Sequence, residues 1–194
     1  TSRLSEIRRG IAAACKISRR EPSSVTLIAV TKARSAEDIE QLIAAGQRDF
    51  GENRIQEAQA KWTALRARHG DVRLHMIGRL QSNKADEAVA LFDSIHSLDR
   101  QSLLAALAKA ADKAGRLPSV YVQVNIGAEE QKGGVAIGEL PALLEEVRSS
   151  PLPLAGLMCI PPAGQQSGPY FALLAELARR HDVSGLSMGM SADY

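Results

Sequence analysis

Lys32 is the residue of this sequence whose position most directly suggests chemistry. It closes a run of apolar and β-branched residues over positions 25–32, which predicts a buried strand. Ser35, followed three residues later by Asp38, predicts the start of a helix. The amine therefore falls where a strand passes into a loop, the edge on which α/β proteins place reactive groups. There it is either desolvated and able to attack a carbonyl, or a solvated lysine at a strand end.

Four other residues at predicted strand ends have both a chemical and a structural interpretation. His75 and His96 could be acid–base groups or metal ligands, but no third ligand has a recognisable spacing, so we expect hydrogen-bonded or exposed histidines. Glu52 could act as a base, and we expect a hydrogen-bonding or solvated carboxylate. Cys159 follows an apolar run, so we expect it to be packed and unreactive.

Three polar segments could contact a ligand. Residues 187–191 hold two serines and a glycine, and they form either a phosphate site at a helix start or a plain turn. Residues 81–84 could bind an anion or only cap a helix. Residues 127–134 are a polar loop that could act as a lid.

Helix and strand patterns that would position these residues alternate along the whole chain. Strands are predicted at residues 25–32, 48–51, 72–77, 93–96, 120–126, 152–160 and 185–190. Helices are predicted at residues 4–14, 36–45, 53–69, 82–91, 101–114, 137–147 and 169–180. Such alternation predicts parallel strands with right-handed crossovers, in a TIM barrel or a doubly wound sheet. The absence of a Gly-rich fingerprint after the first strand favours the barrel.

The predicted strands are one fewer than a closed barrel needs. The sequence stops at Tyr194 after the seventh, whereas a complete TIM barrel takes about 200 residues or more. We therefore expect one α/β domain over residues 1–194, a TIM (β/α)8-type barrel that lacks its final strand and helix. An open barrel would expose the edges of its first and last strands.

Composition limits the class of protein and its partners. The 194 residues are 45% hydrophobic and supply a core, and a net charge of +2 with interspersed acids and bases gives no footprint for nucleic acid. Cys15 and Cys159 are too few for a disulfide framework. Neither a signal peptide nor a membrane span is recognisable, so we expect a soluble, cytoplasmic protein without a membrane partner.

Six sequence blocks, in order, resemble a known family. They are AVTK at 29–32, FGENRIQE at 50–57, HMIGRLQSNK at 75–84, QVNI at 123–126, GLMCIPP at 156–162 and LSMGMS at 186–191. Together they resemble the pyridoxal phosphate homeostasis protein family, the single-domain relatives of the alanine racemase barrel. The resemblance covers essentially the whole chain, and six ordered blocks are far more specific than a single Gly-rich motif.

The resemblance implies a cofactor and a set of residues that bind it. It implies the barrel known as fold type III among pyridoxal phosphate proteins, with Lys32 holding pyridoxal 5'-phosphate as an aldimine. It also implies that Asn53, Ile77, Met190 and Ser191 line the pocket, with Ser191 near the phosphate. Members of the family continue past the last block through a helix to an eighth strand, which the sequence does not contain.

Two functions remain open at this point. The first is a carrier that binds the cofactor, takes part in its intracellular homeostasis and delivers it to apo-enzymes, as a monomer or weak homodimer. The alternative is an amino-acid racemase, which needs a second acid–base group opposite the first. We expect the carrier, with little or no catalytic turnover, because no tyrosine falls at a suitable strand end. The three tyrosines are Tyr121, Tyr170 and Tyr194.

Overall fold

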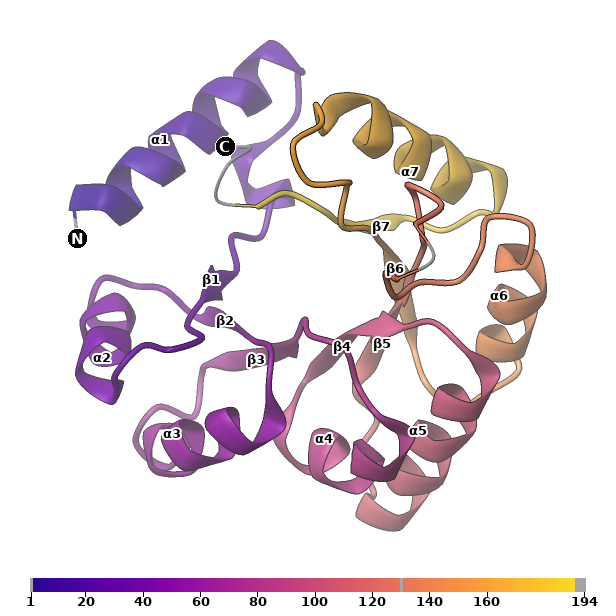
Figure 1. Cartoon of the computed structure of the whole chain (residues 1–194). Coiled ribbons are helices and arrows are strands. Elements are labelled where there is room, and N and C mark those ends of the chain that lie inside the picture. Colours follow the sequence, from indigo (N-terminus) through magenta and orange to yellow (C-terminus); the bar gives the residue numbers. More distant parts are fainter. Residues whose placement is uncertain (1, 130, 191–194) are drawn as a thin grey trace.

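The computed structural model describes residues 2–129 and 131–190 and contains one curled parallel sheet with helices on its outer side (Figure 1). The strands are β1 Ala29–Val30, β2 Asp49–Glu52, β3 Arg73–Met76, β4 Ser94–Leu98, β5 Ser119–Gln123, β6 Leu154–Met158 and β7 Gly185–Ser187. The helices are α1 Ser2–Ile17, α2 Ala36–Ala44, α3 Ile55–Arg68, α4 Ala85–Leu91, α5 Gln101–Ala114, α6 Leu140–Arg148 and α7 Gly168–Arg180. Short 3-10 turns are η1 Pro22–Ser24 and η2 Ser82–Lys84.

The order of the strands decides between the two predicted architectures. Every strand pairs in parallel with the next one along the chain, in the order β1-β2-β3-β4-β5-β6-β7. A doubly wound sheet would reverse its order at a switch point, whereas a TIM barrel does not. The prediction of a barrel-type α/β fold is therefore confirmed. In the described part of the chain β1 pairs only with β2 and β7 only with β6, and Figure 1 shows the gap between them.

Local signals place the helix ends as expected. The side chain of Ser35 accepts a hydrogen bond from the Asp38 amide and caps α2, which is followed by Gly46 with a φ of +84°. Helix α5 has the bounds expected from the sequence and ends at Gly115 in the left-handed conformation. Its buried residues recur at helical spacing: Leu103, Leu104, Leu107, Ala110 and Ala111. No helix in residues 2–129 and 131–190 is long and apolar enough to cross a bilayer.

The apolar core lies between the sheet and the helices. Phe50 of β2 and Trp62 of α3 are both fully buried, with ring centroids 4.9 Å apart. Because side chains alternate along a strand, Phe50 and Glu52 point to the helices, and Asp49 and Gly51 belong to the opposite, inner face. This inner face carries several polar residues, which matter for the site.

The first strand differs from its prediction. The run over residues 25–32 forms only the two-residue strand β1, and Val30 is 47% exposed rather than buried. Apolar composition predicts a strand but does not reveal how many neighbours it has, and β1 lies at an edge of the sheet. Other elements differ mainly at their ends: β7 stops at Ser187, and the helix predicted over 82–91 begins as a 3-10 turn.

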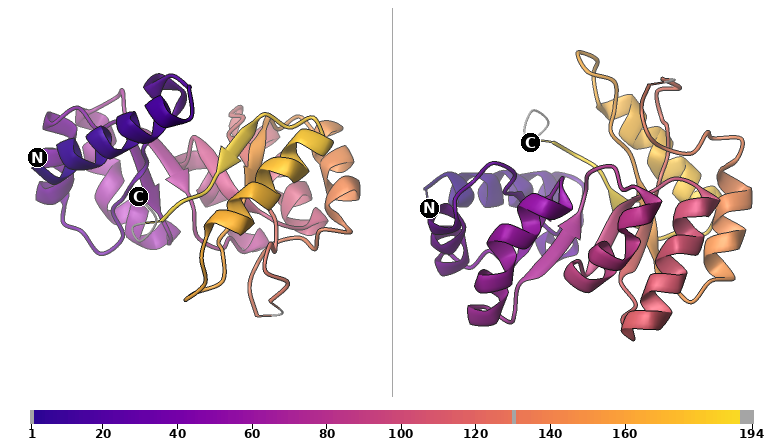
Figure 2. Two further views of the ribbon diagram at one scale, coloured as in Figure 1. Left: turned by 90° about the horizontal axis from the view of Figure 1, so that it is seen from above. Right: turned by 60° about the horizontal axis from the view of Figure 1, so that its bottom comes forward.

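Two loops at the carboxyl ends of β5 and β6 project from the same side of the molecule (Figure 2). Lys132 Nζ donates a hydrogen bond to Pro161 O over 3.2 Å and forms an ion pair with Glu129. The side-chain amide of Asn125 donates through Nδ2 to Glu129 O and accepts through Oδ1 from Glu129 N. The polar loop over residues 127–134 is thus held to the loop after β6.

Candidate functional site at the carboxyl ends of the strands

Lys32, Asn53 and Ile77 lie at the same level of three neighbouring strands. Val30 pairs with Gly51, and Gly51 pairs with His75. Lys32, Asn53 and Ile77 each follow one of these paired residues by two positions, in the same order. The hydrogen bonds from Thr31 N to Gly51 O and from Ile77 N to Glu52 O, both 3.0 Å, continue the pairing past the strand ends. The register therefore brings Lys32, Asn53 and Ile77 together at the carboxyl ends of β1, β2 and β3, which are called the carboxyl edge of the sheet below.

The backbone on either side of Lys32 is fixed, while its side chain is exposed. Thr31 Oγ1 donates to Glu52 Oε1 over 2.7 Å, and Lys61 Nζ donates to Thr31 O over 2.7 Å. Ala33, at a φ of +57°, donates its amide hydrogen to the carboxylate of Glu57. The amine of Lys32 has no hydrogen-bond or ion-pair partner in the part of the chain that the structure describes. The chain thus presents an unpaired amine from a rigid turn.

Glu52 supports this turn from the outer face of the sheet, where α3 packs. Its carboxylate is wholly buried, and Oε1 accepts hydrogen bonds from Thr31 and from Trp62 Nε1 at 3.0 Å, with Lys61 Nζ at 2.9 Å. The interpretation of Glu52 as a hydrogen-bonding carboxylate is confirmed. The supporting roles of Lys61 and Trp62 were not predicted. The i,i+4 spacing of Glu57 and Lys61 was the available signal, but such pairs are usually surface features.

Asn53 and Ile77 contribute a polar and an apolar group to the same edge. The Oδ1 atom of Asn53 is buried and has no hydrogen-bond partner among the described residues. A Cβ atom on Gly51 would lie 3.0 Å from Ile28 Cγ2 and 3.1 Å from Ile77 Cδ1, so the glycine lets two isoleucines form one apolar wall. Gly78 packs directly on the Asn53 backbone, where a Cβ would lie 2.2 Å from Asn53 O. An unpaired acceptor beside an apolar wall suits a flat, polar-edged ring.

The two remaining predicted site residues follow β7. Met190 is 46% exposed, and the segment leading to it runs from β7 across the gap towards β1 (Figure 1). Ser191 lies outside the described residues. Among residues 81–84, Ser82 accepts a hydrogen bond from Arg100 and Lys84 pairs with Glu87, so these polar groups have partners within the protein.

The histidines and the cysteine agree with their structural interpretations. His75 Nδ1 and His96 Nε2 lie 3.0 Å apart in a hydrogen bond. No group of three residues suited to a metal occurs within residues 2–129 and 131–190. Burial raises the pKa of the Cys159 thiol to about 11, which keeps it protonated and unreactive.

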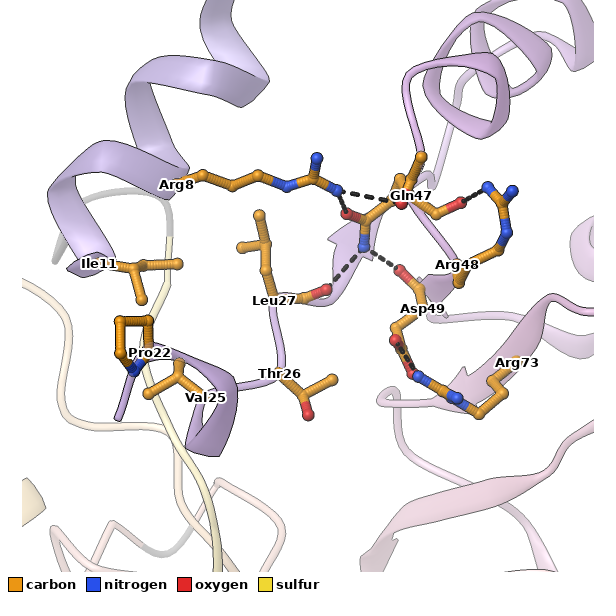
Figure 3. Close-up of a pocket in the computed structure, with 11 residues that line it drawn as sticks. Arg8, Ile11, Pro22, Val25, Thr26, Leu27, Gln47, Arg48, Asp49 and Arg73 are labelled. Atoms are coloured by element: carbon orange, nitrogen blue, oxygen red, sulfur yellow. Dashed lines mark hydrogen bonds and ion pairs between the residues drawn. The ribbon is translucent and has the colours of Figure 1, made fainter. Parts of the chain in front are cut away.

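A hollow of about 500 Å³ lies at the opposite, amino-terminal end of the strands (Figure 3). Several of its polar side chains are already paired: Gln47 Nε2 donates to Leu27 O and Asp49 O over 2.6 and 2.7 Å. Arg73 holds the Asp49 carboxylate through two bonds of 2.7 and 2.6 Å, and Arg8 donates to Gly46 O. These hydrogen bonds hold the amino-terminal ends of the strands together, whereas the unpaired amine of Lys32 and the Oδ1 atom of Asn53 lie at the carboxyl ends.

Comparison with known proteins agrees with this geometry. The family model described as alanine racemase, N-terminal domain, matches residues 3–193. The pyridoxal phosphate homeostasis protein of Synechocystis sp. is 40% identical over 89% of this chain and 84% of its own length. That of Aquifex aeolicus is 37% identical over 99% of this chain and 88% of its own length.

Solved structures give the same result. PipY of Synechococcus elongatus PCC7942, whose structure has PLP bound, is 38% identical with a TM-score of 0.79, covering 94% of this chain and 90% of PipY. Alanine racemase of Clostridium difficile 630 has a TM-score of 0.66 at 13% identity, over 87% of this chain and 47% of the racemase. The second likeness shows a shared fold alone. The chain therefore belongs to the pyridoxal phosphate homeostasis protein family, whose barrel is that of the alanine racemase N-terminal domain.

Proposed function

We propose that this protein binds pyridoxal 5'-phosphate through Lys32 and takes part in its homeostasis and delivery. The observation that carries the proposal is the register of Lys32, Asn53 and Ile77, which places an unpaired amine, an unpaired amide oxygen and an apolar wall at one edge. The PipY structure with PLP bound, at 38% identity, supports the choice of ligand.

The residues at this edge fit the cofactor group by group. Pyridoxal 5'-phosphate supplies an aldehyde that condenses reversibly with an amine, a flat ring and a phosphate dianion. Lys32 provides the amine, Ile77 the wall against the ring and Asn53 a polar contact at the ring edge. Met190 and Ser191, on the segment after β7, complete the proposed site.

The experiment that tests the proposal is mass spectrometry after incubation with the cofactor and reduction with borohydride. The reduced cofactor should remain on Lys32, and Lys32→Ala should lose both this mass and the near-visible absorbance. Lys109→Ala, at an exposed position of α5, is the matched control and should retain both. Cofactor found on another lysine would place the site elsewhere.

We further propose that the protein works as a carrier in the cytoplasm, as a monomer or weak homodimer, with apo-enzymes as recipients. A carrier needs a reversible covalent attachment and an accessible site, and the exposure of Lys32 on the turn after the edge strand β1 favours both. Transfer of cofactor to an apo-enzyme, followed by recovery of that enzyme's activity, tests delivery. Sedimentation over a range of protein concentrations tests the oligomeric state.

A further inference from the structure

A chain of hydrogen bonds crosses the inner face of the sheet from β2 to β7, and the proposed function leaves it without a role. Asp49 Oδ1 lies 3.0 Å from His75 Nε2. His75 Nδ1 lies 3.0 Å from His96 Nε2. His96 Nδ1 lies 2.7 Å from Ser187 Oγ. These four residues, Asp49, His75, His96 and Ser187, are called the inner-face chain below.

Both the start and the middle of the inner-face chain are held in place. Arg73 holds the Asp49 carboxylate through two hydrogen bonds, in the fork geometry that fixes a carboxylate most firmly (Figure 3). Tyr121 stacks on the ring of His96 at 4.2 Å between centroids and 17° between planes, and His96 is 1% exposed. A buried polar array with every link formed is a specific arrangement, because an unpaired group there would be costly.

The ionisation states fix the direction of the first hydrogen bond of the inner-face chain. Burial opposes ionisation of Asp49, but hydrogen bonds from His75 and Arg73 outweigh it and hold the pKa of this carboxyl at about 2. Burial, with the nearby His75, lowers the pKa of His96 to about 3, so His96 is neutral near pH 7. Asp49 can then only accept, and His75 Nε2 must donate to it.

The ring of His96 links the other two members of the inner-face chain. A neutral imidazole has one donor and one acceptor nitrogen, so His96 donates at one end and accepts at the other, linking His75 Nδ1 to the hydroxyl of Ser187. The hydroxyl of Ser187 is therefore tied through His96 to residues on β2 and β3.

We propose that the inner-face chain is a positioning relay that holds the segment after β7 in place for cofactor binding. The inference rests on the proposed function, because Met190 and Ser191 follow Ser187 on that segment. In the described part of the chain β7 is three residues long and pairs only with β6, so the sheet alone holds it weakly.

The inner-face chain supplies the missing connection between the two halves of the proposed site. It ties Ser187 to His75 on β3 and to Asp49 on β2, and these two strands lead directly to Ile77 and Asn53. The relay thus fixes the β7 segment relative to the opposite wall, although none of its members is proposed to touch the cofactor. Loss of one link should weaken cofactor binding without unfolding the protein.

The test is spectroscopic titration of the whole protein with pyridoxal 5'-phosphate, with melting of the cofactor-free protein measured in parallel. Ser187→Ala should weaken affinity roughly five- to tenfold, the scale of one lost hydrogen bond. Ser187→Thr retains the hydroxyl and should restore most of the affinity. The matched control is Ser94→Ala, on the same inner face, whose hydroxyl accepts a hydrogen bond from Ser119 Oγ over 3.0 Å; its affinity should stay within about twofold.

A double-mutant cycle separates a relay from two unrelated effects. His75→Gln should weaken binding as Ser187→Ala does, and the combined variant should be little worse than either alone. Equal affinity of the native, Ser187→Ala and His75→Gln proteins would overturn the relay and leave the proposed function standing. The relay would also be overturned if the fold-losses of affinity in the two single variants multiplied in the double variant, or if Ser187→Thr failed to restore affinity. Absence of binding by the native protein itself would instead overturn the proposed function.

Discussion

The carboxylate of Glu52 is wholly buried and lies 2.9 Å from the ammonium group of Lys61, which also holds the carbonyl of Thr31. The pair connects β2 and α3 to the turn that carries Lys32. The Oε2 atom of Glu52 has no partner among the described residues, so this charge depends on the bonds to its other oxygen. The turn at Lys32 therefore owes its rigidity to a buried ion pair.

Removal of Lys61 should destabilise the protein strongly. Lys61→Met would leave the Glu52 charge buried with only neutral donors, and we expect a loss of about 3 kcal/mol in the free energy of unfolding. Urea unfolding measures this loss. Adding Glu52→Gln removes the stranded charge and should restore part of it, while Lys109→Met on the surface of α5 should have almost no effect. A loss below about 1 kcal/mol in Lys61→Met would contradict a stabilising role for the pair.

Gly78 should be intolerant of even the smallest side chain. A Cβ atom there would lie 2.2 Å from the carbonyl oxygen of Asn53, which belongs to the backbone and cannot rotate away. Gly78→Ala should therefore cost roughly 1–3 kcal/mol in stability and displace Asn53, with weaker cofactor binding. The control is Gly70→Ala, where a Cβ would meet nothing within 4 Å. Matching melting temperatures and affinities for the two variants would show that the loop beside Asn53 yields easily.

The inner-face chain should make the protein less stable in acid, beginning below about pH 6.5. Burial lowers the pKa of His96 from 6.5 to about 3, so between these values the unfolded chain binds a proton that the folded protein does not. The free energy of unfolding then falls as pH falls, with a slope of up to roughly 1.4 kcal/mol per pH unit. The Asp49 carboxyl, whose pKa is lowered from 3.8 to about 2, adds a second loss below about pH 3.8.

Urea unfolding at a series of pH values between 7 and 4 checks this dependence. His96→Gln, which cannot titrate, should have a lower stability at pH 7 and a flatter slope. His181→Gln, on the outer side of the fold and outside the inner-face chain, is the matched control and should keep the native slope. An equally steep slope in His96→Gln would assign the acid sensitivity to other groups.

Much of this arrangement follows from the sequence, and the remainder depends on neighbours that a sequence does not specify. Helical and alternating periodicities located the elements, and their strict alternation predicted the sequential parallel sheet. The exposure of Val30 was missed because an edge strand and a buried strand have the same composition. The inner-face chain was missed because His96 and Ser187 are 91 positions apart and meet only through the strand register.

The final prediction concerns catalysis: racemisation of amino acids should be negligible. Reversing an α-carbon requires one group to remove a proton and another to return it on the opposite face. Lys32 can serve one face, but no tyrosine in the described part of the chain is placed for the other. Tyr121 stacks on His96, burial raises the pKa of its phenol, and Tyr170 hydrogen-bonds Gln165 on the surface.

Turnover should therefore stay far below the roughly 10 per second of ordinary enzymes. Chiral analysis of a panel of amino acids incubated with the cofactor-loaded protein measures it, with the Lys32→Ala variant as the blank. The 13% identity to alanine racemase carries only the fold and gives no reason to expect its activity. Robust turnover that disappears in Lys32→Ala would show that the protein is a racemase and not a carrier. The second acid–base group would then have to lie outside residues 2–129 and 131–190, or reach the site through the gap between β1 and β7.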